Sequence, residues 1–173
     1  RRVLFRSRAG GALQFAIMIL PRETPAADRV AALPAAADLV IVGCGAAGLF
    51  AAIHAGRTAA GAGRRLSVVG LDGARKPGAK ILVSGGGRCN VTNVRVTQRD
   101  YAGSTPPAIR RVLARFLPED TVGFFRAAGV EMYEEPDNGK LFPVTDSSRT
   151  ILDRKSTRLN SSHEWISRMP SSA

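Results

Sequence analysis

The chain has 173 residues, the size of one ordinary domain, with 25 Lys and Arg against 14 Asp and Glu and a formal net charge of +11. Its hydrophobic content of 45% is typical of a globular protein and excludes wholesale disorder. Two cysteines are too few for a disulfide scaffold or a four-cysteine zinc site. The high charge makes nucleic acid or an anionic membrane the first hypothesis for a partner.

Much of the excess charge lies at the two ends of the chain. Residues 1–8 hold four arginines and no acid, residues 153–173 carry a net +2, and residues 9–152 carry the remaining +5. The strings Val3-Leu-Phe-Arg-Ser7 and Lys155-Ser-Thr-Arg-Leu-Asn-Ser-Ser-His163 resemble translated sequencing adapter. We therefore base no prediction of the fold on either end.

These composition shifts divide the chain into three segments. Residues 1–37 read as a leader with a non-native start, residues 38–152 as the natural domain, and residues 153–173 as an artefactual or disordered tail. The leader resembles a secretory signal, but Pro21 stands where a cleavage site should be, and Met18 is a plausible true start. No apolar run approaches the roughly 20 residues that a membrane span needs. We expect a cytoplasmic protein without a membrane partner.

The first motif opens the natural domain. Asp38-Leu-Val-Ile-Val42 predicts a β-strand that leads into Gly43-Cys-Gly-Ala-Ala-Gly48, and residues 46–57 predict a helix. In this pattern the first glycine permits a tight turn, the second lets the backbone approach a pyrophosphate, and the third lets the helix pack closely on the strand. The free N–H groups at the helix start, including those of Ala46 and Ala47, favour phosphate.

An acidic residue completes this motif. Leu66 to Leu71 predicts a second strand, and Asp72 follows it where a carboxylate would accept hydrogen bonds from the ribose hydroxyls of an adenosine. The order strand, turn, helix, strand and acid predicts an α/β, Rossmann-type three-layer domain that binds FAD or NAD(P). This motif alone does not distinguish the two dinucleotides.

A second glycine motif lies in residues 75–93. Gly85-Gly86-Gly87 is suited to lie against a planar ring or a phosphate, and hydrogen-bonding side chains surround it. Lys76, Lys80 and Arg88 add positive charge beside an expected pyrophosphate. A single-cofactor NAD(P) domain has no evident use for this loop, so the loop favours FAD.

The string from Lys76 to Asn93, Lys-Pro-Gly-Ala-Lys-Ile-Leu-Val-Ser-Gly-Gly-Gly-Arg-Cys-Asn-Val-Thr-Asn, resembles the signature of BaiN/RdsA-type flavoproteins. This family of NAD(P)/FAD-dependent oxidoreductases is also called the aminoacetone-oxidase family. Val130 to Glu135 and Asn138-Gly-Lys-Leu-Phe-Pro-Val144 resemble a further family segment. The resemblance covers about residues 37–152.

The resemblance implies an FAD-dependent oxidoreductase, with NAD(P)H as a candidate electron donor and a small molecule as substrate. It places the cofactor on residues of both motifs: Gly43, Gly45, Ala46, Ala47, Gly48, Asp72, Lys80, Ser84, Gly85, Gly86, Gly87, Arg88, Cys89 and Asn90. Family members continue past the position of Leu152 into a substrate domain, so we expect a truncated, inactive N-terminal part of the enzyme.

The remaining residues predict packing. The apolar pattern predicts two helices, over residues 108–117 and 119–128, and Gly129 is expected to end the second one. After them we expect a strand over residues 130–133 and a hairpin turn at residues 137–139.

The sequence predicts no catalytic side chain. Cys89 has either a redox role or a packing role, and neither cysteine has a Cys-x-x-Cys partner. Four acids, Glu131, Glu134, Glu135 and Asp137, predict a solvated hairpin edge. The sequence predicts no metal site and no catalytic triad.

Two rival functions stay open. An NAD(P)-dependent dehydrogenase shares the first motif, and a basic nucleic-acid-binding module fits the charge. The second rival predicts aromatic residues interleaved with arginines, but aromatic residues make up only 6% of the chain. We therefore expect no nucleic-acid partner.

Overall fold

The computed structural model describes residues 2–6, 13–19, 25, 27, 33–74 and 76–153. These residues divide into two compact units, one up to Lys80 and the other from Ile81 onward. The adapter-like string Lys155–His163 lies outside the described residues.

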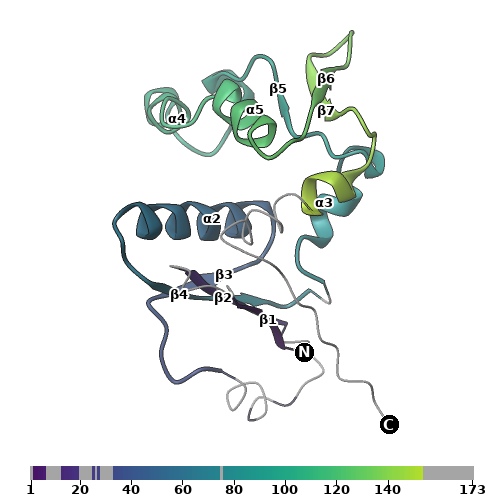
Figure 1. Cartoon of the computed structure of the whole chain (residues 1–173). Coiled ribbons are helices and arrows are strands. Elements are labelled where there is room, and N and C mark those ends of the chain that lie inside the picture. Colours follow the sequence, from purple (N-terminus) through teal and green to yellow (C-terminus); the bar gives the residue numbers. More distant parts are fainter. Residues whose placement is uncertain are drawn as a thin grey trace. The chain divides into compact units, whose positions relative to one another are not determined.

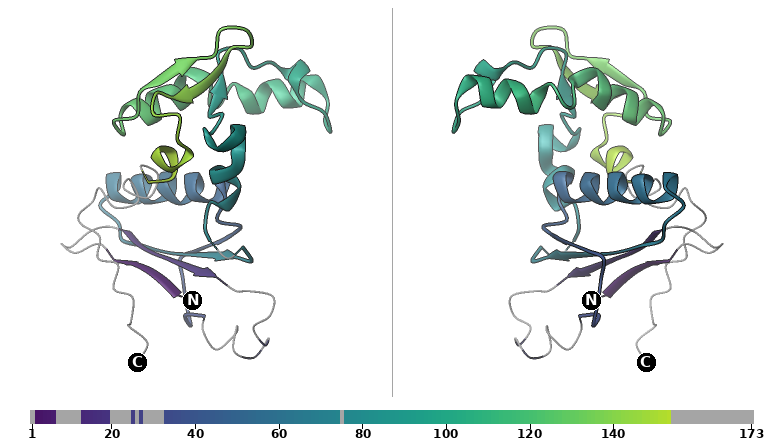
Figure 2. Two further views of the ribbon diagram at one scale, coloured as in Figure 1. Left: turned by 90° about the vertical axis from the view of Figure 1, so that its right-hand side faces the viewer. Right: turned by 90° about the vertical axis from the view of Figure 1, so that its left-hand side faces the viewer.

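The first unit contains the predicted strand, turn, helix and strand. They are β3 (Leu39–Val42), α2 (Ala46–Gly61) and β4 (Leu66–Asp72), and β3 pairs in parallel with β4. α2 lies along one face of the sheet, as both Figure 1 and Figure 2 show. Its buried face includes Leu49 and Ile53, which are each 2% exposed. The α/β, Rossmann-type fold predicted from the sequence is confirmed, with α2 ending four residues later than expected.

Two further strands join this sheet from a segment predicted to be a leader. β1 (Arg2–Arg6) pairs antiparallel with β2 (Leu13–Ile19), and β2 pairs in parallel with β4, giving the strand order β1-β2-β4-β3. The sequence predicts no strand here. The run Leu-Gln-Phe-Ala-Ile-Met-Ile of β2 is largely apolar, as is typical of strands in parallel sheets.

The second unit holds a small antiparallel sheet with the strand order β5-β7-β6. Its strands are β5 (Thr92–Asn93), β6 (Met132–Glu134) and β7 (Lys140–Pro143), and a hairpin turn at the predicted position joins β6 to β7. In this turn the Glu135 N–H donates to the Lys140 carbonyl oxygen over 2.8 Å.

The second unit also contains two helices that follow β5 in the chain. α4 (Pro106–Leu113) and α5 (Pro118–Arg126) both begin at a proline, whose fixed φ suits the first turn of a helix. The predicted helices therefore exist, but each begins one or two residues earlier than expected and ends before its predicted end. The cap of α5 is Ala127, and the predicted Gly129 follows it with φ +73°.

The core of the second unit joins distant parts of its chain. Phe125, Val130, Phe142 and Ile151 are each at most 3% exposed. Residues 148–153 are helical, and the buried Ser148 hydroxyl donates to the Leu82 carbonyl oxygen over 2.9 Å. Leu82 belongs to α3 (Ala79–Val83), the short helix directly before the second glycine motif.

Candidate dinucleotide site

Three glycines of the first motif have three different environments. Gly43 adopts φ +93°, and its N–H donates to the Leu71 carbonyl oxygen over 2.8 Å, so the chain turns sharply beside the end of β4. A Cβ on Gly45 would meet no atom within 4 Å. A Cβ on Gly48 would overlap the carbonyl oxygen of Gly43. The tight turn at Gly43 and the close helix packing at Gly48 are those predicted from the sequence. The open space at Gly45 is compatible with the approach of a ligand, which stays a prediction.

The start of α2 is suited to an anion. Its N-cap residue, Gly45, supplies no side-chain cap, and the first turn contains no acidic residue. Ala46 and Ala47 are exposed there. The first N–H groups of a helix have no partner within the helix, and the helix dipole adds partial positive charge at this end. A phosphate group would therefore be stabilised at the Gly45–Gly48 turn.

Asp72 lies at the end of β4, as predicted, and it also shapes the turn. One carboxylate oxygen, Oδ2, accepts from the Cys44 N–H over 2.8 Å, and the other, Oδ1, accepts from the Ala74 N–H over 2.8 Å. A carboxylate has about four acceptor positions, so these two bonds leave capacity for ribose hydroxyls. The fixing of the turn by Asp72 is a role that the sequence did not reveal.

Cys44 lies inside the turn as a packing residue. It is 1% exposed, and its pKa rises from 9.0 to about 11, first because burial disfavours the thiolate and second because Asp72 is negative. The thiol therefore stays protonated near neutral pH, which is unsuited to nucleophilic or redox chemistry.

The segment with Lys76 and Lys80 is tied to the same turn. Gly78, at φ +67°, donates its N–H to the Cys44 carbonyl oxygen over 2.9 Å. Both lysines are exposed. The first unit thus brings together the three glycines, Asp72 and the backbone of the segment that carries both lysines.

The second glycine motif forms a left-handed turn, η1 (Ser84–Gly87), in the other unit. All three of its glycines have positive φ: +55° at Gly85, +67° at Gly86 and +89° at Gly87. A Cβ on Gly85 would lie 2.6 Å from the Asn90 nitrogen and 2.8 Å from Cε1 of Phe142. Only glycine fits this position, whereas Gly86 faces open space.

The polar side chains of this motif are less available than predicted. The Ser84 hydroxyl donates to the Ile81 carbonyl oxygen over 2.8 Å, and Asn93 donates from Nδ2 to the Asn138 carbonyl oxygen over 2.7 Å. Asn90 is exposed. Cys89 is 6% exposed and has φ +67°, which is uncommon for a residue other than glycine. Its N–H donates to the Ser84 carbonyl oxygen over 3.0 Å and closes the turn.

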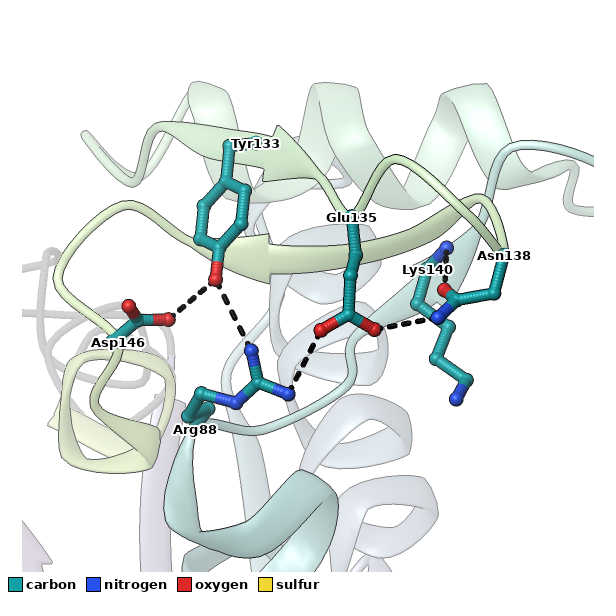
Figure 3. Close-up of polar contacts among 6 residues, drawn as sticks. All are labelled: Arg88, Tyr133, Glu135, Asn138, Lys140 and Asp146. Atoms are coloured by element: carbon teal, nitrogen blue, oxygen red, sulfur yellow. Dashed lines mark hydrogen bonds and ion pairs between the residues drawn. The ribbon is translucent and has the colours of Figure 1, made fainter.

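Arg88 points toward the β6–β7 hairpin (Figure 3). Its Nη2 forms an ion pair with Oε1 of Glu135 over 3.0 Å, and its Nη1 donates to the Tyr133 hydroxyl over 3.3 Å. The guanidinium carbon lies 4.0 Å from the centre of the Phe142 ring, a cation–π contact. The Tyr133 hydroxyl donates in turn to Oδ1 of Asp146 over 2.7 Å.

This network gives Glu135 a role that the sequence did not predict. Glu131, Glu134 and Asp137 are exposed, as expected for a solvated edge. Glu135 accepts hydrogen bonds from Asn138 and from Arg88, which together lower the pKa of its carboxyl. The 47 positions that separate Arg88 from Glu135 leave no local pattern that could have predicted the pair.

The described residues contain no group of three or more His, Cys, Asp or Glu arranged to hold a metal ion. Within that same part of the chain, no helix combines the length and the apolar character that crossing a membrane requires.

The curated proteins that resemble this chain include three named relatives. The chain is 40% identical over 116 residues to a protein of Escherichia coli (strain K12) named "Ribosomal RNA dihydrouridine synthase", covering 67% of this chain and 27% of that protein. A protein of the same name from Haemophilus influenzae is 38% identical over 103 residues, covering 60% and 24%. A "3-dehydro-bile acid delta(4,6)-reductase" of Clostridium scindens is 34% identical over 113 residues, covering 65% and 26%. The chain thus spans about a quarter of the length of these relatives.

A family model described as "HI0933-like protein Rossmann domain" matches residues 37–169. The match contains both glycine motifs and Asp72, and it confirms the family resemblance seen in residues 76–93. It also extends into the segment that the sequence predicts as a tail. Because this match covers well over half of the sequence, the chain belongs to the HI0933-like protein Rossmann domain family.

Proposed function

We propose that this chain carries part of the FAD site of an oxidoreductase. The observation that carries the proposal is the Gly43–Gly48 turn, in which open space at Gly45 adjoins an uncapped helix start and the Asp72 carboxylate. This arrangement fits the pyrophosphate and ribose of a dinucleotide. When bound, the flavin would supply two-electron transfer, and the protein would hold and orient it.

The preference for FAD over NAD(P) rests on the second glycine motif. A turn with three glycines at positive φ exposes backbone without side chains, and Gly86 has open space around it. Such a surface is suited to a flat ring system or to a phosphate. We propose that Ser84, Gly85, Gly86, Gly87, Cys89 and Asn90 contribute to cofactor binding, together with Lys80. An NAD(P)-dependent dehydrogenase is the alternative, but it gives no binding role to this turn.

The names of the relatives suggest the direction of the reaction. One is named as a reductase and two as synthases of a dihydro product. We therefore propose that the whole protein catalyses a reduction and that a reduced nicotinamide is the electron donor. Because this chain spans about a quarter of those relatives, we propose that it is inactive by itself.

The same names favour two substrate classes. The bile-acid name supports a small-molecule substrate, which is the class expected from the sequence. Ribosomal RNA in the other names makes RNA the second candidate, and Arg110, Arg111 and Arg115 are exposed on and just after α4. RNA binding that weakens steeply with salt, and weakens further when these arginines become alanines, would favour the second candidate.

A flavin measurement tests the proposal. Purify this chain and a version extended to the length of the relatives, and record visible absorbance after removal of free cofactor. We expect bound flavin in the extended protein and much less in the short chain, because an incomplete site lacks the preorganisation that tight binding requires. If neither protein holds flavin after incubation with excess FAD, the proposal is wrong. Retention of NAD(P) instead would favour the dehydrogenase.

A further inference from the structure

The left-handed turn η1 needs something outside itself to hold its shape. Gly85, Gly86, Gly87 and Cys89 all have positive φ, and at Cys89 this conformation is unfavourable because the residue has a Cβ. Within the turn, the Arg88 N–H donates to the Gly85 carbonyl oxygen over a long 3.3 Å, and the Cys89 N–H makes a bond of 3.0 Å. Unfavourable backbone conformations persist only where the surrounding structure determines them.

The β6–β7 hairpin supplies that support. The Phe142 ring, which is 1% exposed, contacts the turn in two places. One edge lies so close to Gly85 that no Cβ fits there, and the Arg88 guanidinium lies over its face. Glu135 and Tyr133 then hold the guanidinium in place (Figure 3). Arg88 thereby connects the turn to two neighbouring strands.

The same contacts direct the charge of Arg88 toward a carboxylate of its own unit. The guanidinium is 3.0 Å from the Glu135 carboxylate, which compensates its charge. Glu135 is itself fixed by Asn138, whose Nδ2 donates to Oε2 over 2.7 Å. A phosphate ligand would have to compete with a carboxylate already in place.

Resting on the proposed function, we infer that Arg88 is a positioning residue that holds the η1 turn against the hairpin through Glu135, and not a ligand of the cofactor phosphates. This differs from the expectation from sequence, in which Arg88 supplies positive charge to the pyrophosphate. Glu135 becomes a second positioning residue, because it fixes the guanidinium.

Glu135→Gln separates the two roles by the sign of its effect. If Arg88 positions the turn, the amides of Arg88 and Cys89 in this chain should exchange hydrogen about two- to fivefold faster, as expected for loss of one partly exposed ion pair. In the extended protein, FAD affinity should fall by a similar factor. If Arg88 contacts phosphate, the same substitution releases a positive charge, so affinity should stay the same or rise, with a steeper salt dependence.

Arg88→Lys provides the second test. Lysine keeps the charge and is a good phosphate ligand, but it lacks the planar fork that reaches Tyr133 and Glu135 together. If Arg88 positions the turn, Arg88→Lys should reduce the protection of the turn amides from hydrogen exchange at least as much as Glu135→Gln does. The affinity for FAD should fall at least as much too. A direct phosphate contact predicts FAD affinity near that of the wild type.

Glu134→Gln is the matched control, because it removes the same charge from an exposed neighbour outside the network. The double variant Arg88→Ala/Glu135→Gln should behave like Arg88→Ala alone, since the two residues act through one contact. The inference is overturned if Glu135→Gln and Glu134→Gln have equal rates of amide hydrogen exchange and equal affinities for FAD. If the extended wild-type protein binds no FAD, the proposed function fails, while hydrogen exchange in the short chain still decides whether Arg88 holds the turn.

Discussion

The two glycine-rich segments of this chain differ in the conformation of their glycines and in the groups that fix them. In the Gly43–Gly48 turn only Gly43 has a positive φ, the Cβ position of Gly45 meets open space, and Gly48 leaves room for the Gly43 carbonyl oxygen. In the Ser84–Gly87 turn, glycine provides conformation, with positive φ at three successive positions. The first turn is fixed by neighbouring backbone and Asp72, and the second by side chains of a hairpin distant in sequence. Similar composition therefore serves two kinds of structure.

The largest effect should come from Gly48→Ala. The added Cβ would overlap the Gly43 carbonyl oxygen, a backbone atom that cannot move without displacing β3 from α2. We expect the free energy of unfolding of the first unit to fall by about 3 kcal/mol, at the upper end for overpacking. Urea denaturation followed by circular dichroism measures this loss. Gly61→Ala, at the exposed end of α2 with no atom near the added Cβ, is the control and should not destabilise the unit.

A smaller difference should separate two adjacent glycines of the second turn. Gly85→Ala combines a left-handed φ with contacts to Asn90 and Phe142, so we expect a loss of about 2–3 kcal/mol. Gly86→Ala has a left-handed φ but open space, so the loss should be only about 1 kcal/mol. Urea denaturation of both variants checks this order. Equal losses would mean that Phe142 does not hold the turn.

Asp72→Asn should lower the free energy of unfolding of the first unit by about 2 kcal/mol. The carboxylate accepts from two backbone N–H groups, whereas an amide has only one acceptor oxygen. Asp38→Asn is a useful comparison, since among the residues that the structure describes Asp38 accepts from one backbone N–H, that of Ser67, at an exposed position. Denaturation midpoints of the two variants measure the difference. A larger effect at Asp38 would contradict the structural role given to Asp72.

At neutral pH the smallest effect should come from the Cys44 thiol, because its titration changes stability only from about pH 9 upward. Its pKa is about 11 in the folded chain against 9.0 ordinarily, so the folded state retains the thiol proton over a range where the unfolded state loses it. The free energy of unfolding should therefore fall as pH rises from 9 toward 11. Denaturation of wild type and Cys44→Ala at several pH values isolates this contribution. Asp72→Asn should lower the Cys44 pKa only in part, because burial is the larger cause.

The two segments also differ in how far the sequence could predict them. The strand, turn, helix and strand of the first unit follow from patterns within about 35 residues, since β-branched strands and glycine spacing are local signals. The turn at Gly43 and the close packing at Gly48 were predicted for the same reason, and the ligand role of Gly45 stays a prediction. The Arg88–Glu135 pair was not, because it depends on a hairpin folding back onto the turn.

Other differences have the same physical origin. Glu135 was assigned to a solvated edge because its neighbours in sequence are acidic, yet its carboxylate forms an ion pair with Arg88. The pairing of β2 with β4 was missed because the apolar run before Pro21 also reads as part of a leader. Composition identified the apolar segments, but it did not identify their partners.

The most direct test is the FAD affinity of Gly45→Ala in the protein extended to the length of its relatives. A methyl group here meets no protein atom and the backbone has φ −78°, so the fold should be unchanged by circular dichroism and thermal denaturation. The same methyl group occupies the space proposed for the pyrophosphate, so FAD binding should fall at least tenfold, equivalent to about 1.4 kcal/mol. Unchanged FAD affinity in a folded Gly45→Ala protein would contradict the proposed site.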